Sequence, residues 1–265
     1  MTLCLAFRSG MSSKSDLRGA MDAGVPVGVV AGHLTTAQIV MALPRYLDSG
    51  SKVFIDSGAF TAERTGETMD WARVLSVYES VAGLTDRPEM LYVVAPDKVG
   101  CQGETLNLLR RYRKQLQQLL AQGVQLIVPL QYGNLPAATM LASAQEILET
   151  DRFVAGIPAN KAAMPIEECR SLQHHTFHIL GRVQADGEQV ERIETLRAGN
   201  PGVFVSGDAN WLRSHLGVVA MLTDTERLAP SSPRRVFGEH PRVCAIRNEI
   251  ERDLSWGFED RRVAV

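Results

Sequence analysis

Short apolar runs recur along the chain, and each is followed by a stretch with helical periodicity. Most of the runs are rich in β-branched residues, and several are continuously apolar instead of alternating, which is typical of strands covered on both faces. They occupy residues 3–7, 27–31, 53–57, 91–96, 126–131, 153–158, 177–182 and 203–208. The pattern predicts eight strands.

The intervening segments have the spacing of amphipathic helices. The clearest covers 104–123, where leucines at 106, 109, 116, 119 and 120 form one stripe and Gly123 is a plausible end. Similar periodicity predicts helices over 69–83, 136–150 and 186–199, and Pro165 favours a further helix start.

Strands that alternate with helices predict a parallel sheet with right-handed crossovers. Eight strands close a (β/α)8 TIM-like barrel, so the expected fold class is α/β. A doubly wound open sheet is the alternative, but no Gly-rich dinucleotide motif follows the first strand. We expect one domain over 1–265, with the barrel in about 1–224 and a short helical C-terminal extension in about 225–265.

Composition narrows the function less than the pattern does. Apolar residues make up 45% of the chain and charged residues 22%, and the net charge of -2 argues against coating nucleic acid by bulk charge. The four cysteines are scattered without metal-ligand spacing, which predicts reduced thiols, a cytoplasmic protein, and neither metal nor cofactor. No apolar run approaches a membrane span.

Three carboxylates stand at or just after strand ends, Asp56, Asp97 and Asp208. An aspartate in such a place usually caps a helix or ties down a loop. In a barrel, however, all three would face one mouth, where like charges raise each other's pKa. Paired carboxylates serve as nucleophile and proton donor in glycosyl transfer, and a third beside amide groups can read the edge of a heterocycle. Metal binding is the competing use, but no histidine or clustered acid is suitably placed.

The residues around these carboxylates resemble those of tRNA-guanine transglycosylases. VFIDSGAF is similar to that family's DSGGF segment, with Ala59 in place of a second glycine, and VSGDANWL lies where the family has its catalytic aspartate. VAPDKV, PLQYGN, VAGIPAN and FHILGRV resemble its strand-end aspartate, Gln-x-Gly, Gly-Leu-Ala and Leu-Met-Gly segments. The matches keep the family's order over roughly residues 25–215.

The resemblance implies roles for these positions. Asp208 would attack C1′ of a guanosine-type nucleotide and hold the sugar covalently, and Asp56 would be the general acid and base for the departing and incoming bases. Asp97 would accept hydrogen bonds from the base edge. The full implied substrate-binding set is Ser57, Gly58, Asp97, Gln131, Gly133, Gly156 and Ile157.

The chain departs from the family in ways that bear on its substrate. The tRNA enzymes carry a CxCxxC-plus-His zinc site, whereas here Cys244 stands alone. The chain is therefore more similar to the zinc-free, DpdA-type members that insert 7-deazaguanines into DNA. Asn160 and Lys161 replace an acidic residue of the family, which favours 7-cyano-7-deazaguanine as the incoming base. The predicted function is exchange of guanine in nucleic acid, with DNA preferred, for a 7-deazaguanine.

A polymer substrate requires a surface that contacts phosphates and bases. The candidates are Trp211, Arg213, Arg234 and Arg235, while the basic run at 110–114 is better explained as the solvated face of a helix. The expected partners are nucleic acid and the deazaguanine base, and helper proteins that open a duplex are compatible with this function.

Three alternatives remain open. They are a tRNA-guanine transglycosylase, a small-molecule nucleosidase-like barrel enzyme, and a family member that binds without catalysis. The last is disfavoured, because a binding protein has no need to hold three repelling carboxylates together.

Overall fold

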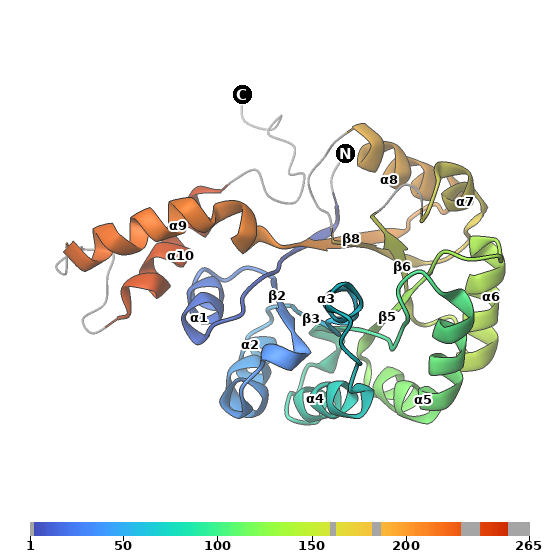
Figure 1. Ribbon diagram of the computed structural model, residues 1–265, viewed down its shortest axis with the longest axis horizontal. Coiled ribbons are helices and arrows are strands. Elements are labelled where there is room, and N and C mark those ends of the chain that lie inside the picture. Colours follow the sequence, from blue (N-terminus) through green and yellow to red (C-terminus); the bar gives the residue numbers. More distant parts are fainter. Residues whose placement is uncertain (1–2, 160–162, 182–186, 229–238, 254–265) are drawn as a thin grey trace.

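Eight parallel strands form a closed barrel, with the helices outside it (Figure 1). The computed structural model describes residues 3–159, 163–181, 187–228 and 239–253. Strands neighbour one another in chain order, and the pairing of the first with the eighth closes the ring. The predicted (β/α)8 barrel is therefore confirmed. The strands are β1 Leu5–Arg8, β2 Val27–Val30, β3 Val53–Asp56, β4 Leu91–Val94, β5 Gln125–Pro129, β6 Val154–Pro158, β7 Thr176–Leu180 and β8 Phe204–Ala209.

Helices follow the strands along the chain. They are α1 Lys14–Asp22, α2 Leu43–Asp48, α3 Ala59–Thr65, α4 Trp71–Gly83, α5 Gln102–Gln122, α6 Ala137–Leu148, α7 Ile166–Ser171, α8 Gly187–Gly199, α9 Trp211–Leu228 and α10 Pro241–Arg252. Of these, α4, α5, α6 and α8 lie where the periodicity predicts them. The 3-10 helices η1 Ala31–His33 and η3 Pro88–Met90 and the π-helix η2 Gln38–Ala42 complete the described elements. In α5 four of the five striped leucines are buried, and Gly123 ends the helix with a φ of 99°.

Two apolar layers lie on either side of the strands. The larger one fills the space between strands and helices. The smaller one fills the barrel interior and consists of Leu5, Phe7, Phe54, Tyr92, Val94, Ile127 and Val154. The Phe7 ring centroid is 5.6 Å from that of Phe54 and 5.1 Å from that of Tyr92, so aromatic rings form much of this inner layer.

The C-terminal part of the described chain packs beside the barrel. Helices α9 and α10 lie against each other and extend to the left in Figure 1, and α10 also packs against α1. The Arg242 Nε donates to Asp16 Oδ1 at 2.7 Å, which joins α10 to α1 through a largely buried ion pair. Helix α9 runs from Trp211 to Leu228. The expected boundary between the barrel and the C-terminal extension, near residue 225, therefore falls inside this helix.

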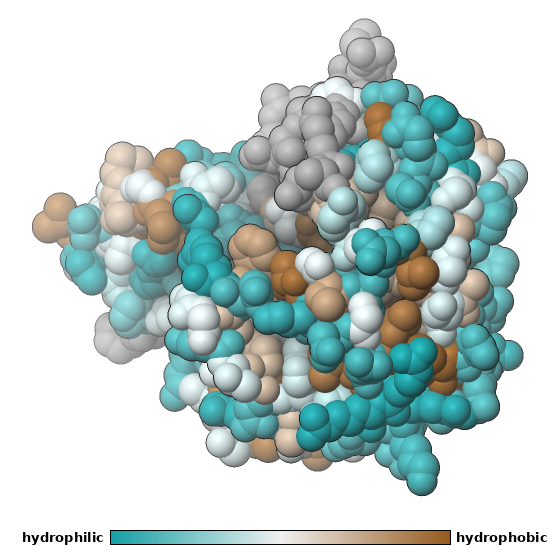
Figure 2. Space-filling view, turned by 45° about the vertical axis from the view of Figure 1, so that its right-hand side comes forward, coloured by the Kyte–Doolittle hydropathy of each residue, from teal (hydrophilic) through white to brown (hydrophobic). Residues whose placement is uncertain are grey.

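The surface is mixed in polarity. On the face in Figure 2, hydrophobic side chains lie in small groups among hydrophilic ones. In the part of the chain that the structure describes, no helix combines the length and apolarity needed to cross a bilayer.

Gly19 tests the packing of α10 on α1. A Cβ at this position would lie 2.7 Å from both Ile246 Cβ and Val243 O, so Gly19→Ala should lower the free energy of unfolding by about 1–3 kcal/mol. Gly217→Ala is the matched control, because nothing lies within 4 Å of its Cβ position in α9. Helix propensity alone should there raise stability by up to about 1 kcal/mol.

Urea unfolding of both variants would provide the measurement. A Gly19→Ala protein as stable as the Gly217→Ala protein would contradict the close contact between the two helices.

Candidate active site

Polar side chains gather at the carboxyl ends of the barrel strands. Asp56 ends β3, Asp97 and Gln131 follow β4 and β5, and Asp208 lies near the end of β8. Asp56 is close enough to both other carboxylates that Asp208 raises its pKa, while Asp56 in turn raises that of Asp97. The three carboxylates thus share one mouth, which is where barrel enzymes place their chemistry.

The Asp208 carboxylate is held by three hydrogen-bond donors. Its Oδ1 accepts from the Gly181 backbone N–H at 2.8 Å and faces His178 Nε2 at 3.2 Å. Its Oδ2 accepts from the Ser9 hydroxyl at 3.3 Å. Asp208 is only 8% exposed, so these donors replace the water that would otherwise solvate the carboxylate. Hydrogen bonds to both oxygens fix the orientation of the carboxylate.

Glycines make this arrangement possible. Gly181 has a φ of 78°, a conformation that side chains disfavour, and the turn it forms after β7 presents its N–H to Asp208. Gly28 in β2 leaves room for Ser9, because a Cβ there would lie 2.0 Å from the Ser9 Oγ. The nucleophile candidate is therefore positioned by backbone features of β2 and β7.

Asp97 has one bonded and one unpartnered oxygen. Gln131 Nε2 donates to Asp97 Oδ2 at 2.7 Å, and the Gly100 N–H donates to Gln131 Oε1 at 2.9 Å, which fixes the amide orientation. Asp97 Oδ1 is buried and has no hydrogen-bond partner among the residues that the structure describes. Burial and then the Asp56 charge raise the pKa of Asp97 to about 7, against the opposing effect of Gln131. When Asp97 is ionised, this oxygen is an acceptor that none of the described residues supplies with a donor.

Asp56 interacts electrostatically with both Asp208 and Asp97. Burial and then the Asp208 charge raise the pKa of Asp56 to about 6, although hydrogen bonds from Gly58 and Ser57 oppose the shift. The Gly58 N–H donates to Asp56 Oδ1 at 3.1 Å, and Gly58 has a φ of 88° where α3 begins. The Ala59 N–H donates to the Ser57 hydroxyl at 3.2 Å. The turn thus orients a carboxyl group whose pKa is suited to proton transfer near neutral pH.

The other predicted base-binding residues lie around this mouth in different ways. A Cβ on Gly156 would meet Ile127 Cγ2 at 3.0 Å, so β5 and β6 approach closely there. Gly133 lies against Gln102, whose Oε1 would be 2.4 Å from a Cβ. The Ile157 side chain is fully buried in the layer between strands and helices, on the side of the sheet away from the barrel interior.

The predicted nucleic-acid contacts require one correction. Trp211 is fully buried, its ring stacks on His215 at 4.3 Å, and its Nε1 donates to Asp253 Oδ2 at 2.6 Å. The prediction that Trp211 contacts nucleic acid is therefore wrong, because its ring anchors α9 instead. Arg213 is exposed on the first turn of α9. Arg234 and Arg235 lie outside the described residues, as do Asn160 and Lys161.

Sequence reasoning missed the residues that hold Asp208. His178, Ser206, Ser9 and Gly181 were not among the predicted site residues, although all four form this network. Strand parity is the signal that could have revealed His178. Its neighbours Phe177 and Ile179 face the helices, so the histidine between them must face the barrel interior.

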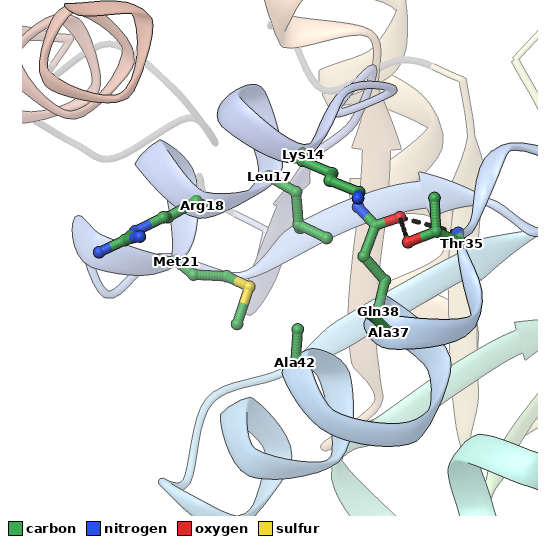
Figure 3. Close-up of a pocket in the computed structure, with 8 residues that line it drawn as sticks. All are labelled: Lys14, Leu17, Arg18, Met21, Thr35, Ala37, Gln38 and Ala42. Carbon is green, nitrogen blue, oxygen red and sulfur yellow. Dashed lines mark hydrogen bonds between the residues drawn. The ribbon is translucent and has the colours of Figure 1, made fainter. Parts of the chain in front are cut away.

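A separate groove lies between α1 and η2 (Figure 3). It has a volume of about 260 Å³ and a mainly apolar lining, with Gln38 Oε1 accepting from the Thr35 N–H and hydroxyl on one side. Its lining residues are Lys14, Leu17, Arg18, Met21, Thr35, Ala37, Gln38 and Ala42. None of them belongs to the carboxylate cluster, so the groove is not part of the candidate active site.

No protein-family model and no curated protein sequence matches the chain. Among solved structures, a xylose isomerase domain protein from Planctomyces limnophilus matches with a TM-score of 0.53 and 15% identity, covering 86% of this chain and 98% of that one. The YdjI aldolase from Escherichia coli K12 gives a TM-score of 0.48 and 12% identity, covering 96% and 93%. A D-tagatose 3-epimerase-like protein gives 0.48 and 13%, covering 87% and 98%.

The first of these likenesses shows a shared TIM-barrel fold. The comparisons assign the chain to no family, so the resemblance to tRNA-guanine transglycosylases stays a prediction.

The raised pKa of Asp97 makes a prediction about stability. A carboxyl group with a folded-state pKa of about 7 stays protonated while its unfolded counterpart ionises above about pH 4. Its contribution therefore reduces stability progressively as pH rises from about 4 to about 7. Asp97→Asn removes the charge and should raise the free energy of unfolding at pH 8 by roughly 2–4 kcal/mol, with little gain at pH 4.

Urea unfolding at the two pH values would measure the difference. Asp224→Asn, at an exposed position in α9, is the control and should change stability by less than about 0.5 kcal/mol at either pH. An equal gain for Asp97→Asn at both pH values would show that Asp97 is not held protonated.

Proposed function

We propose that this protein exchanges guanine in nucleic acid for a 7-deazaguanine through a covalent aspartyl-sugar intermediate. The observation that carries the proposal is the contrast between two neighbouring carboxylates. Asp208 has three donors, whereas burial and the Asp208 charge raise the pKa of Asp56 to about 6. A nucleophile held by donors beside a carboxyl group that can give and take a proton is the arrangement that double-displacement glycosyl transfer requires.

In the first displacement, an Asp208 oxygen attacks C1′ of the target nucleotide. The bond from C1′ to N9 of guanine breaks, and its electron pair leaves with the base. Asp56 donates its proton to the departing base and becomes a carboxylate. The sugar is then held as an aspartyl ester, which keeps the polymer attached to the protein.

The second displacement reverses these changes with another base. Asp56 takes the N9 proton of the incoming 7-deazaguanine, and N9 attacks C1′. The bond from C1′ to the Asp208 oxygen breaks, with its electron pair returning to the carboxylate. Two inversions give net retention at C1′, so the modified nucleotide keeps the original anomeric configuration.

In this proposal Asp97 and Gln131 recognise the base. Asp97 Oδ1 lacks a donor, and guanine and 7-deazaguanine both present N–H groups on the same edge, whereas adenine presents a ring-nitrogen acceptor there. A base that donates to Oδ1 would satisfy this buried oxygen. A base that presents an acceptor would leave it unsatisfied, and such mismatches are strongly rejected by polar sites.

Two exposed aromatic side chains support a substrate that contains bases. Phe60 is 67% exposed at the start of α3, four residues after Asp56, and Tyr132 is 58% exposed directly after Gln131. Exposed aromatic rings beside a polar site stack favourably on nucleobases. The preference for DNA and for 7-cyano-7-deazaguanine rests on the sequence resemblance, particularly the scattered cysteines and the residues at 160 and 161.

Labelled-base exchange tests the proposed activity. Purified protein would be incubated with labelled guanine or 7-cyano-7-deazaguanine and, in separate reactions, with duplex DNA, single-stranded DNA and tRNA. We expect label to enter DNA, and Asp208→Asn to reduce incorporation by at least about 10³-fold because the nucleophile is lost.

Incorporation into tRNA alone would move the substrate to the RNA branch. If the wild-type protein neither incorporates label nor binds any of the three polymers, a small-molecule substrate replaces the proposal. Substantial exchange by folded Asp208→Asn would remove Asp208 from the nucleophile role.

Asp97→Asn tests base recognition separately. The change places a donor or a fixed amide where an acceptor is needed, so discrimination between guanine and adenine should fall about ten- to a hundredfold. Polymer affinity, measured by fluorescence anisotropy, should be nearly unchanged. Loss of polymer binding with selectivity retained would instead make Asp97 a structural residue.

A further inference from the structure

The ring of His178 joins the candidate nucleophile to the interior of the barrel. His178 is fully buried on β7, with Nε2 at 3.2 Å from Asp208 Oδ1 and Nδ1 at 2.9 Å from the Ser206 hydroxyl. The ring also stacks on Phe54, with centroids 5.1 Å apart and planes inclined by 19°. Packing and two polar contacts therefore hold this imidazole in one orientation.

The surroundings determine which nitrogen carries the proton. If the Ser206 hydroxyl donates a hydrogen bond to Nδ1, a neutral ring carries its proton on Nε2. The Nε2–H then donates a hydrogen bond to Asp208. If the Ser206 hydroxyl instead donates to the Phe177 carbonyl at 3.3 Å, Nδ1 must donate to Ser206. A neutral ring would then turn the Nε2 lone pair towards the carboxylate, which is repulsive. The favourable arrangement is therefore the first one, in which Nε2–H points at Asp208 Oδ1.

The two oxygens of Asp208 consequently differ. Oδ1 faces the donors of Gly181 and His178, both built into β7 and the turn that follows it. Within the described residues, Oδ2 has a single, longer bond from Ser9, at 3.3 Å. Donors on Oδ1 occupy its lone pairs and stay in place, whereas the Ser9 hydroxyl can rotate away. The less encumbered Oδ2 is the oxygen that can form a bond to carbon.

We propose that His178 is a positioning residue that dedicates Asp208 Oδ2 to attack on the sugar, with Oδ1 held as the carbonyl oxygen of the ester. The inference rests on the proposed function. In the first displacement Oδ2 bonds to C1′, while the electron pair of the C1′–N9 bond leaves with the base, which is protonated by Asp56. In the second, the pair of the C1′–Oδ2 bond returns to the carboxylate. The His178 N–H stabilises this returning charge without reorganising.

Two substitutions of His178 separate positioning from simple packing. A glutamine amide nitrogen reaches close to the place of Nε2 and can still donate to Asp208, whereas an asparagine amide reaches only the place of Nδ1 near Ser206. Both variants lose the ring and its stacking on Phe54. We therefore expect kcat of base exchange to be about ten- to a hundredfold lower in His178→Asn than in His178→Gln, with KM for the base unchanged in both.

His174 provides a control for the loss of a buried histidine. It is also buried, but its Nε2 contacts the Phe153 carbonyl at 2.7 Å and it precedes β7, at the other end of the barrel. His174→Asn should leave the kcat of exchange unchanged. Equal kcat values for folded His178→Asn and His178→Gln would overturn the positioning role.

A second measurement does not depend on exchange activity. In protein labelled with ¹⁵N-histidine, the His178 Nε2–H should give a downfield resonance that is displaced or lost in Asp208→Ala and persists in Asp56→Ala. Absence of any response to Asp208→Ala would overturn the inference, whatever the exchange assay gives. The resonance could respond to Asp208→Ala while the wild-type protein exchanges no base. That result would support the contact between His178 and Asp208 and refute the proposed function.

Discussion

The pairing of β8 with both β1 and β7 is the constraint on which the rest of the site depends. It sets Phe7 opposite Asp208 on one side and His178 opposite Ser206 on the other. Strand alternation then makes Ser206 and Asp208 face the same side, because they are two residues apart. A shift of one residue in either register would turn the carboxylate towards the helices, so barrel closure itself positions the candidate nucleophile.

The interior of the barrel explains why the carboxylates at its mouth behave differently. Phe7, Phe54 and Tyr92 form an apolar layer within the strands, and His178 packs against two of these rings. Carboxyl groups near such a layer lose solvation, and burial raises the pKa of both Asp56 and Asp97. Asp208 obtains three donors, whereas Asp97 has an oxygen with none. The distribution of donors, more than burial alone, therefore separates the roles of the carboxylates.

Much of the fold could be predicted from the sequence, because apolar runs and helical stripes are local signals. All eight strands lie close to their predicted ranges, as do helices α4, α5, α6 and α8, whereas α9 was not predicted as a helix. The gathering of Asp56, Asp97 and Asp208 followed from their places at strand ends. What holds Asp208 could not be predicted as readily, since Ser9 and Gly181 are distant in sequence and act through a hydroxyl and a backbone N–H.

Trp211 was mistaken for a surface group for a related reason. Its position after β8 indicates the mouth, but only tertiary contacts reveal that its ring turns towards His215 and Asp253.

The unsatisfied oxygen of Asp97 connects stability to ligand binding. A buried acceptor without a donor costs free energy, and natural proteins retain such groups mainly where a function requires them. A ligand N–H that reaches Oδ1 would remove this cost and would favour the ionised form of Asp97. The same ionisation would place a second negative charge near Asp56 and hold its proton more tightly until the leaving base accepts it. Recognition of the base and readiness of the acid would then be two consequences of one hydrogen bond.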